Sequence, residues 1–140
     1  MNKNCKLSLL LFVTFIFPGF STYAEDKPNF IESYSVTDSK VAAKEIAAIL
    51  IHMEHFVVSH EKKMLKSISK NSKLSPNVRS LAKAVINIQH KPLHSDIEKM
   101  RDIYQNEHSP VAVQELAYII MNFKYKPKDK DLAMLKEIVK

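Results

Sequence analysis

The chain repeats its own pattern at an interval of 35 residues. Residues 75–92 read SPNVRSLAKAVINIQHKP and residues 109–127 read SPVAVQELAYIIMNFKYKP, so the later segment keeps the Leu-Ala, Asn and Lys-Pro positions and gains one residue near its start. A step of 35 residues back from Leu81 arrives at Ile46, in a third and more divergent copy. Internal similarity at a period of about 20–50 residues is typical of proteins built from stacked structural repeats. The sequence therefore predicts a chain of ~35-residue units.

Each unit is predicted to contain two α-helices. The only glycine is Gly19, and the apolar residues that follow it keep a helical period without strand-like alternation. In the middle unit, Ser75 is placed to cap a helix and Pro76 takes its first position, where a missing N–H costs nothing. The apolar stripe of this helix consists of Val78, Leu81, Ala82, Val85 and Ile88.

We expect an all-α fold of about six helices, arranged as stacked antiparallel hairpins in a short α-solenoid. A single hairpin of this size does not bury its apolar face alone, so neighbouring hairpins have to stack. The predicted helices cover about 38–57, 60–72, 76–91, 96–106, 110–125 and 129–139.

One copy of the unit resembles the HEAT and HEAT-like repeats. The match is best over residues 64–90, where an apolar helix and a short polar turn precede a helix that opens with Pro-x-Val-Arg. The later copy keeps the proline but has Gln114 in place of the arginine, and the unit is shorter than is usual for HEAT. The resemblance implies a right-handed stack of helical hairpins that is used as a binding surface. The residues that carry it are Pro76, Val78, Arg79, Ala82, Val85 and Ile88.

The first residues have the three parts of a secretory signal peptide. Lys3 and Lys6 precede an apolar run of about 11 residues, too short to span a bilayer, and the small-residue end is Ala24. We expect cleavage after Ala24, and hence a periplasmic or secreted protein without stable membrane insertion. The predicted organisation is a signal peptide over 1–24, an irregular lead-in over 25–36 and one helical-repeat domain over 37–140.

The charge of the chain is modestly basic. Its formal net charge of +6 falls to about +4 when Lys3 and Lys6 leave with the signal peptide. A charge of this size does not by itself indicate nucleic-acid binding, and the expected export counts against a nucleic-acid partner. The single cysteine, Cys5, also lies in the leader, so the exported chain contains no thiol.

The segment HMEHFVVSH, residues 52–60, raises the hypothesis of a metal site. His52 and His55 are three residues apart and are expected to share one helical face, and neutral imidazoles are good zinc ligands. A third ligand is not evident, because His60 follows a predicted helix start and His90 lies one unit away. A periplasmic metal or haem carrier that uses His52 and His55 is the alternative function.

The sequence offers no catalytic motif. It has no glycine-rich phosphate loop, no Gly-x-Ser-x-Gly elbow and no Cys-x-x-Cys-His haem motif. Its carboxylates are scattered over predicted helix starts and polar faces, which are ordinary surface positions. We therefore expect neither an enzyme nor a bound cofactor.

The preferred function is a module that binds another protein or peptide in the cell envelope, with an inhibitor or immunity-type role as one form of it. One position of the repeat is filled by His55, His90 and Tyr125, which are rings with a polar tip near each predicted helix end. We expect these rings to lie along one ridge of a helix-lined face. The lysines that border this face are Lys83, Lys91, Lys124 and Lys126.

Overall fold

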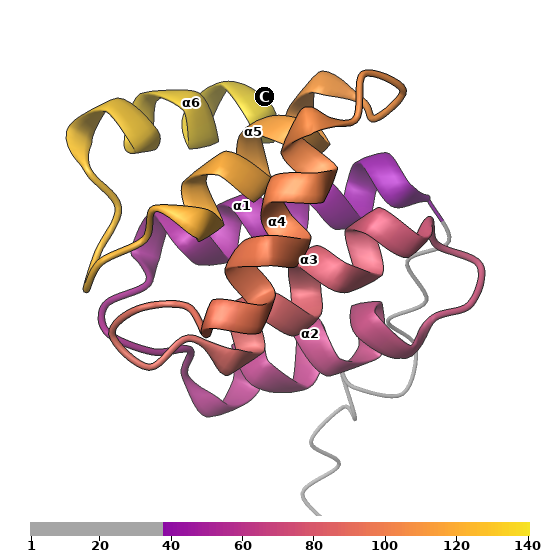
Figure 1. Ribbon diagram of the computed structural model, residues 1–140. Coiled ribbons are helices and arrows are strands. Elements are labelled where there is room, and N and C mark those ends of the chain that lie inside the picture. The colour runs from indigo at the N-terminus through magenta and orange to yellow at the C-terminus, as the bar shows by residue number, and fades with distance from the viewer. Residues whose placement is uncertain (1–37) are drawn as a thin grey trace, which may run out of the picture.

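The computed structural model describes residues 38–140, which form six α-helices and no β-strand (Figure 1). The helices are α1 (Ser39–His52), α2 (Ser59–Lys70), α3 (Pro76–Asn87), α4 (His94–Gln105), α5 (Val111–Met121) and α6 (Asp129–Val139). The expected all-α fold of six helices is confirmed. The predicted signal peptide (1–24) and lead-in (25–36) lie outside the described residues. Within residues 38–140, no helix has the length and apolar character needed to cross a membrane.

The helices form three pairs. α2 packs against α3 and α4 packs against α5, as the sequence predicts for hairpins. The third pair joins the two ends of the described chain, because α6 packs against α1 (Figure 1). α6 therefore takes the place beside α1 that α2 takes beside α3.

The open stack of hairpins expected from the sequence is not confirmed. In an open stack the first and last helices lie at opposite ends, and their outer faces need polar capping. Here the first and last helices cover each other, and α1, α3 and α5 also contact one another. The three pairs thus close around a common axis, which removes the exposed apolar ends of an open stack.

The molecule has an inner and an outer layer. The inner helices α1, α3 and α5 each bury five or six residues, whereas the outer helices α2, α4 and α6 each bury two or three. In the described part of the chain, no outer helix packs against another outer helix. The core therefore lies among the inner helices, and each outer helix covers it from one side.

Buried positions recur at the interval found in the sequence. Stepping by 35 residues moves from one fully buried side chain to the next on both layers. These side chains include Leu65, Met100 and Leu135 on the outer helices and Ala47, Ala82 and Ala117 on the inner helices.

The start of α3 follows the prediction. The Ser75 hydroxyl accepts a hydrogen bond from the Val78 N–H at 3.3 Å, and Pro76 is the first helical residue. This bond satisfies one of the N–H groups that have no partner within the helix.

The inner helices end earlier than expected. α1, α3 and α5 end at His52, Asn87 and Met121, which lie four or five residues before the predicted ends at 57, 91 and 125. Beyond each end, the chain turns at a residue with positive φ: His55 (61°), His90 (68°) and Tyr125 (62°). Glycine is the usual residue for this conformation, and asparagine, aspartate and histidine are enriched in it among the other residues. The two histidines were therefore a weak signal of a helix stop, and Tyr125 gave none.

Candidate functional site

Three turns lie together at one end of the molecule, on the left in Figure 1. They join α1 to α2, α3 to α4 and α5 to α6, and each contains one of the positive-φ residues. The central segments of the turns are 54–56, 89–91 and 124–126, and we call these segments the apical surface.

The backbones of the three positive-φ residues form a closed ring of hydrogen bonds. The His90 N–H donates to the His55 carbonyl at 2.7 Å, and the Tyr125 N–H donates to the His90 carbonyl at 2.7 Å. The His55 N–H closes the ring by donating to the Tyr125 carbonyl at 2.5 Å. Each residue donates once and accepts once, so the ring requires all three turns. It forms because the helix pairs surround a common axis.

The side chains of the same residues form a cluster of rings. Ring centroids lie 5.1 Å apart for His55 and His90, 5.5 Å for His55 and Tyr125, and 5.4 Å for His90 and Tyr125. The two pairs that include His55 meet edge to face, at interplanar angles of 84° and 76°. The Nδ1 atoms of His55 and His90 are 3.0 Å apart. All three side chains are exposed, so the cluster faces solvent.

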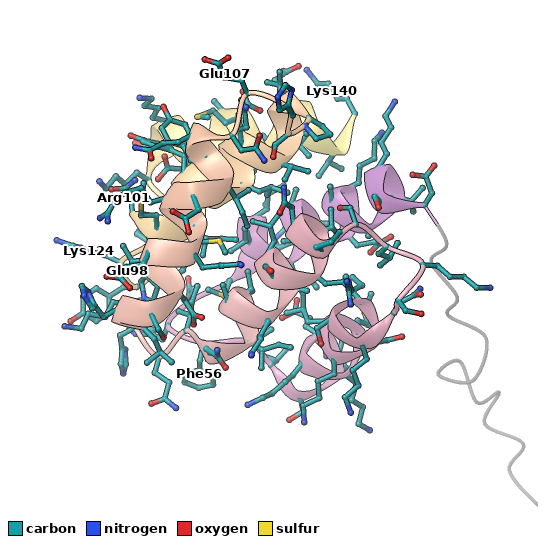
Figure 2. The ribbon with its side chains drawn as sticks, turned by 45° about the vertical axis from the view of Figure 1, so that its right-hand side comes forward. Phe56, Glu98, Arg101, Glu107, Lys124 and Lys140 are labelled. Atoms are coloured by element: carbon teal, nitrogen blue, oxygen red, sulfur yellow. The ribbon has the colours of Figure 1, made fainter. Side chains whose placement is uncertain are left out.

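Exposed apolar side chains gather at the same end. Of the eight large hydrophobic side chains that are exposed among the described residues, four belong to these turns. They are Phe56, Val58, Leu93 and Tyr125. Figure 2 shows Phe56 and Lys124 on one side of the molecule, and Glu107 and Lys140 on the far side. The turns thus combine apolar and aromatic groups that folding leaves in contact with water.

The apical surface also carries a positive charge. Lys91, Lys124 and Lys126 are exposed there, and Glu54 is the one carboxylate of the three central segments. With neutral histidines, this gives a formal charge of +2. Such a surface favours groups that present carboxylates or phosphates, an attraction that salt weakens.

A small hollow opens beside the cluster. Its lining includes Phe56, Val57, Ile86, Gln89 and His90, and Lys62 of α2 reaches it as well. Its volume of about 270 Å³ is below the roughly 300–1,000 Å³ of small-molecule sites, which does not favour a haem-sized ligand. The hollow has room for a side chain of a partner.

The structure brings together six of the seven residues predicted to bind a partner. The exception is Lys83, which lies exposed on α3 outside the turns. The rings do not form the expected ridge on a helix face, because the inner helices end before reaching them. Sequence reasoning missed Phe56, Val58 and Leu93, whose exposure depends on where these helices end.

The alternative metal pair, His52 with His55, does not share a helix face. His52 is the last residue of α1, whereas His55 lies beyond it at positive φ. The premise of that hypothesis is therefore wrong. Among residues 38–140, no three or more histidine, cysteine, aspartate or glutamate side chains are grouped so as to hold a metal ion.

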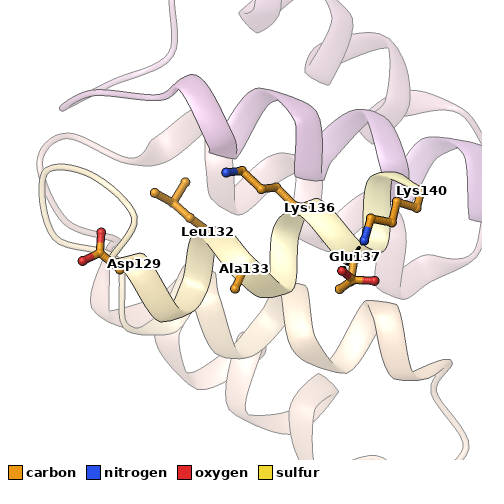
Figure 3. Close-up of a pocket in the computed structure, with 6 residues that line it drawn as sticks. All are labelled: Asp129, Leu132, Ala133, Lys136, Glu137 and Lys140. Atoms are coloured by element: carbon orange, nitrogen blue, oxygen red, sulfur yellow. Dashed lines mark hydrogen bonds and ion pairs between the residues drawn. The ribbon is translucent and has the colours of Figure 1, made fainter.

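A second surface hollow lies along α6 (Figure 3). It is lined by that helix and the residue after it, and Lys140 forms an exposed ion pair with Glu137 there. A hollow with walls from one helix cannot enclose a ligand, and exposed ion pairs add little stability. The apical surface is therefore the better candidate site.

Replacing His90 by glycine should give a protein that is more stable than the alanine variant by about 1 kcal/mol. Both variants lose the imidazole and its ring contacts, but only alanine retains the steric cost of φ at 68°. Urea denaturation measures the difference. The matched pair at exposed Lys83 within α3 should show the opposite order, since glycine in a helix costs about 1 kcal/mol relative to alanine. The same order at both positions would contradict the strained turn.

No protein-family model, curated protein or solved structure matches the chain. The resemblance of residues 64–90 to HEAT-like repeats therefore stays a prediction. A function for the chain therefore has to be inferred from the chemistry of its own surface.

Proposed function

We propose that the protein is an exported binding module that holds another protein or peptide of the cell envelope on its apical surface. The observation that carries this proposal is the exposed cluster of His55, His90 and Tyr125 on a closed ring of backbone hydrogen bonds. Aromatic residues are enriched at protein interfaces, and apolar patches with polar rims mark such sites.

The choice of residues at the positive-φ positions supports a binding role. The backbone ring needs only N–H and C=O groups, which glycine supplies without steric cost. Each ring-bearing residue in this conformation costs about 1–2 kcal/mol. Ring contacts of about 0.5–1.5 kcal/mol per pair offset part of this cost. Exposed rings retained at all three positions therefore favour a role in recognition.

The rigidity of the surface supports the same role. Its central residues are tied to one another through the backbone and are anchored on six helices. Because the free surface already has its binding geometry, a partner loses little free energy in ordering it.

The partner is expected to present negative charge and a side chain that fills the hollow. The lysines of the apical surface favour a partner segment with carboxylates, and the hollow beside His90 has room for one side chain. An inhibitor or immunity-type protein that covers an acidic site on its target fits this chemistry. The predicted signal peptide supports an encounter in the periplasm or outside the cell.

The architecture is proposed to derive from three HEAT-like units of about 35 residues, joined into a closed array. The first unit combines the two ends of the described chain, α6 with α1. Its support is the recurrence of buried positions and positive-φ turns at one interval. The HEAT-like resemblance applies to the single helical hairpin and not to the closed arrangement of the three helix pairs.

Photo-crosslinking from the apical surface tests the proposed function. A photoreactive phenylalanine analogue at Phe56 is expected to capture a discrete envelope protein in intact cells. The same analogue at Val111, exposed at the other end of α5, is the matched control and should not capture it. Capture from Val111 alone, or equal capture from both, would contradict an apical binding surface.

Replacing two rings of the cluster, His90 and Tyr125, tests whether they bind the partner in the same crosslinking experiment. The double variant His90→Asn and Tyr125→Asn should lose the crosslinked product by about tenfold or more, as expected when central aromatic contacts are removed. Asparagine tolerates positive φ, so helicity and the melting temperature should change little. Undiminished capture by this variant would show that the rings are not the binding element.

A further inference from the structure

We propose that His55 and His90 together bind a divalent transition-metal ion through their Nδ1 atoms. This pair differs from the histidine pair that sequence spacing indicates, and it depends on the tertiary fold, because the two residues are 35 positions apart. The site does not depend on a protein partner, so it stands or falls separately from the binding function proposed above.

The distance between the two nitrogens suits a shared ion. Metal–imidazole distances of about 2.0–2.1 Å place two ligand nitrogens about 2.9 Å apart in square-planar geometry and about 3.3 Å apart in tetrahedral geometry. The Nδ1 atoms of His55 and His90 are 3.0 Å apart, between these two values. The separation of the two nitrogens is thus compatible with their binding one ion.

The protonation of the two rings decides whether their Nδ1 atoms share a hydrogen bond or can bind a metal ion. A neutral imidazole has one N–H donor and one acceptor nitrogen. If one Nδ1 carries the proton, the pair forms a hydrogen bond. If both Nε2 atoms carry it, both Nδ1 lone pairs are free to bind one ion that lies to the side of the line between the two nitrogens. Metal binding selects this second combination of tautomers.

The backbone holds the two ligands in place. The His90 N–H donates to the His55 carbonyl at 2.7 Å, so a main-chain hydrogen bond joins the two residues directly. Tyr125 packs against both rings and limits their rotation. Ligands fixed on supported backbone lose little entropy on binding a metal.

The chemistry of the pair indicates which ions it takes. Imidazole suits copper, zinc and nickel, and copper(II) binds most strongly in the usual order of divalent ions. No further histidine, cysteine, aspartate or glutamate of the described chain joins the pair as a third ligand. Water therefore completes the coordination, and the exposed site leaves those positions open to solvent.

Copper(II) and zinc(II) titrations of the full-length protein test the site. We expect one equivalent of copper(II), with an electron paramagnetic resonance spectrum split by two imidazole nitrogens, and one equivalent of zinc(II) by calorimetry. His55→Asn and His90→Asn should each lower the affinity by more than about tenfold, since loss of even a supporting residue costs 10–100-fold. Asparagine suits positive φ, and an unchanged melting temperature without metal verifies that each variant folds.

His52→Asn is the matched control, because it removes the neighbouring histidine at the end of α1. It should leave affinity, stoichiometry and the nitrogen splitting unchanged. The proposal is overturned if the wild-type protein binds neither ion, if both apical variants bind as tightly as wild type, or if His52→Asn weakens binding as much as His90→Asn.

Discussion

Replacing Leu135 of α6 by alanine is expected to lower the free energy of unfolding by about 2–5 kcal/mol. Leu135 is fully buried although its helix is the last in the chain, because α6 packs against α1. Removal of the side chain leaves a cavity between the two ends of the described chain. Urea denaturation of the purified variant measures the loss.

Two comparisons make this result specific for the closed arrangement. Leu65→Ala, at the equivalent place on α2, should cost a similar amount, since both side chains are fully buried. Leu93→Ala, at an exposed leucine, should change stability by less than about 0.5 kcal/mol. If Leu135→Ala behaves like Leu93→Ala, the terminal helix frays in solution and the array is open.

Replacing Phe123 by alanine is expected to cost about 3–5 kcal/mol, the largest loss predicted for a single side chain. Phe123 is 2 % exposed and lies two residues before Tyr125. Met53 and Ile88 are buried at the equivalent places before His55 and His90. These residues anchor the strained turns in the core, so the Phe123 variant should lose stability and also the ordered ring cluster.

Phe56 provides the matched control, because the same chemical change occurs at a ring that is 58 % exposed. Phe56→Ala should stay within about 0.5 kcal/mol of the wild-type stability while lowering the affinity for the captured partner. Thermal and urea denaturation separate the two phenylalanines. Comparable losses for both variants would mean that Phe56 serves the fold, and the apical surface would lose its most exposed apolar group.

The closed arrangement links the fold to the candidate site. One residue from each of the three turns contributes to the backbone ring, and the third turn leads into α6. Loosening α6 from α1 should therefore disturb the ring cluster even though Leu135 lies on a different part of the molecule. Core variants are expected to lose both stability and partner binding. Variants of the apical surface are expected to lose partner binding and to keep their stability.

Much of the fold could be predicted from local chemistry. The spacing of apolar residues located the six helices, and Ser75 with Pro76 marked the start of α3. The interval of 35 residues also aligned the residues that end up in equivalent buried positions. These features depend on side chains that are close in sequence or share one helix face, which is why they can be predicted from the sequence.

The ends of the inner helices could not be predicted in the same way. His55, His90 and Tyr125 are ordinary helix residues by pattern. The ring of hydrogen bonds between the three turns and the buried residue before each turn hold them at positive φ. His55, His90 and Tyr125 are predicted to bind a partner because they occupy one repeat position, and the structure brings these three rings together. Their arrangement as a cluster required the true helix ends.

The sequence by itself determined the number of helices, the pairing of α2 with α3 and of α4 with α5, and the set of residues that share an equivalent position. The tertiary structure alone decided that α6 returns to α1 and that His55 meets His90. The physical reason is that closure depends on small angles between successive hairpins, which add up over the chain and are set by packing of the whole core. No local pattern of residues encodes that sum, and the site at the end of the common axis exists only once the array has closed.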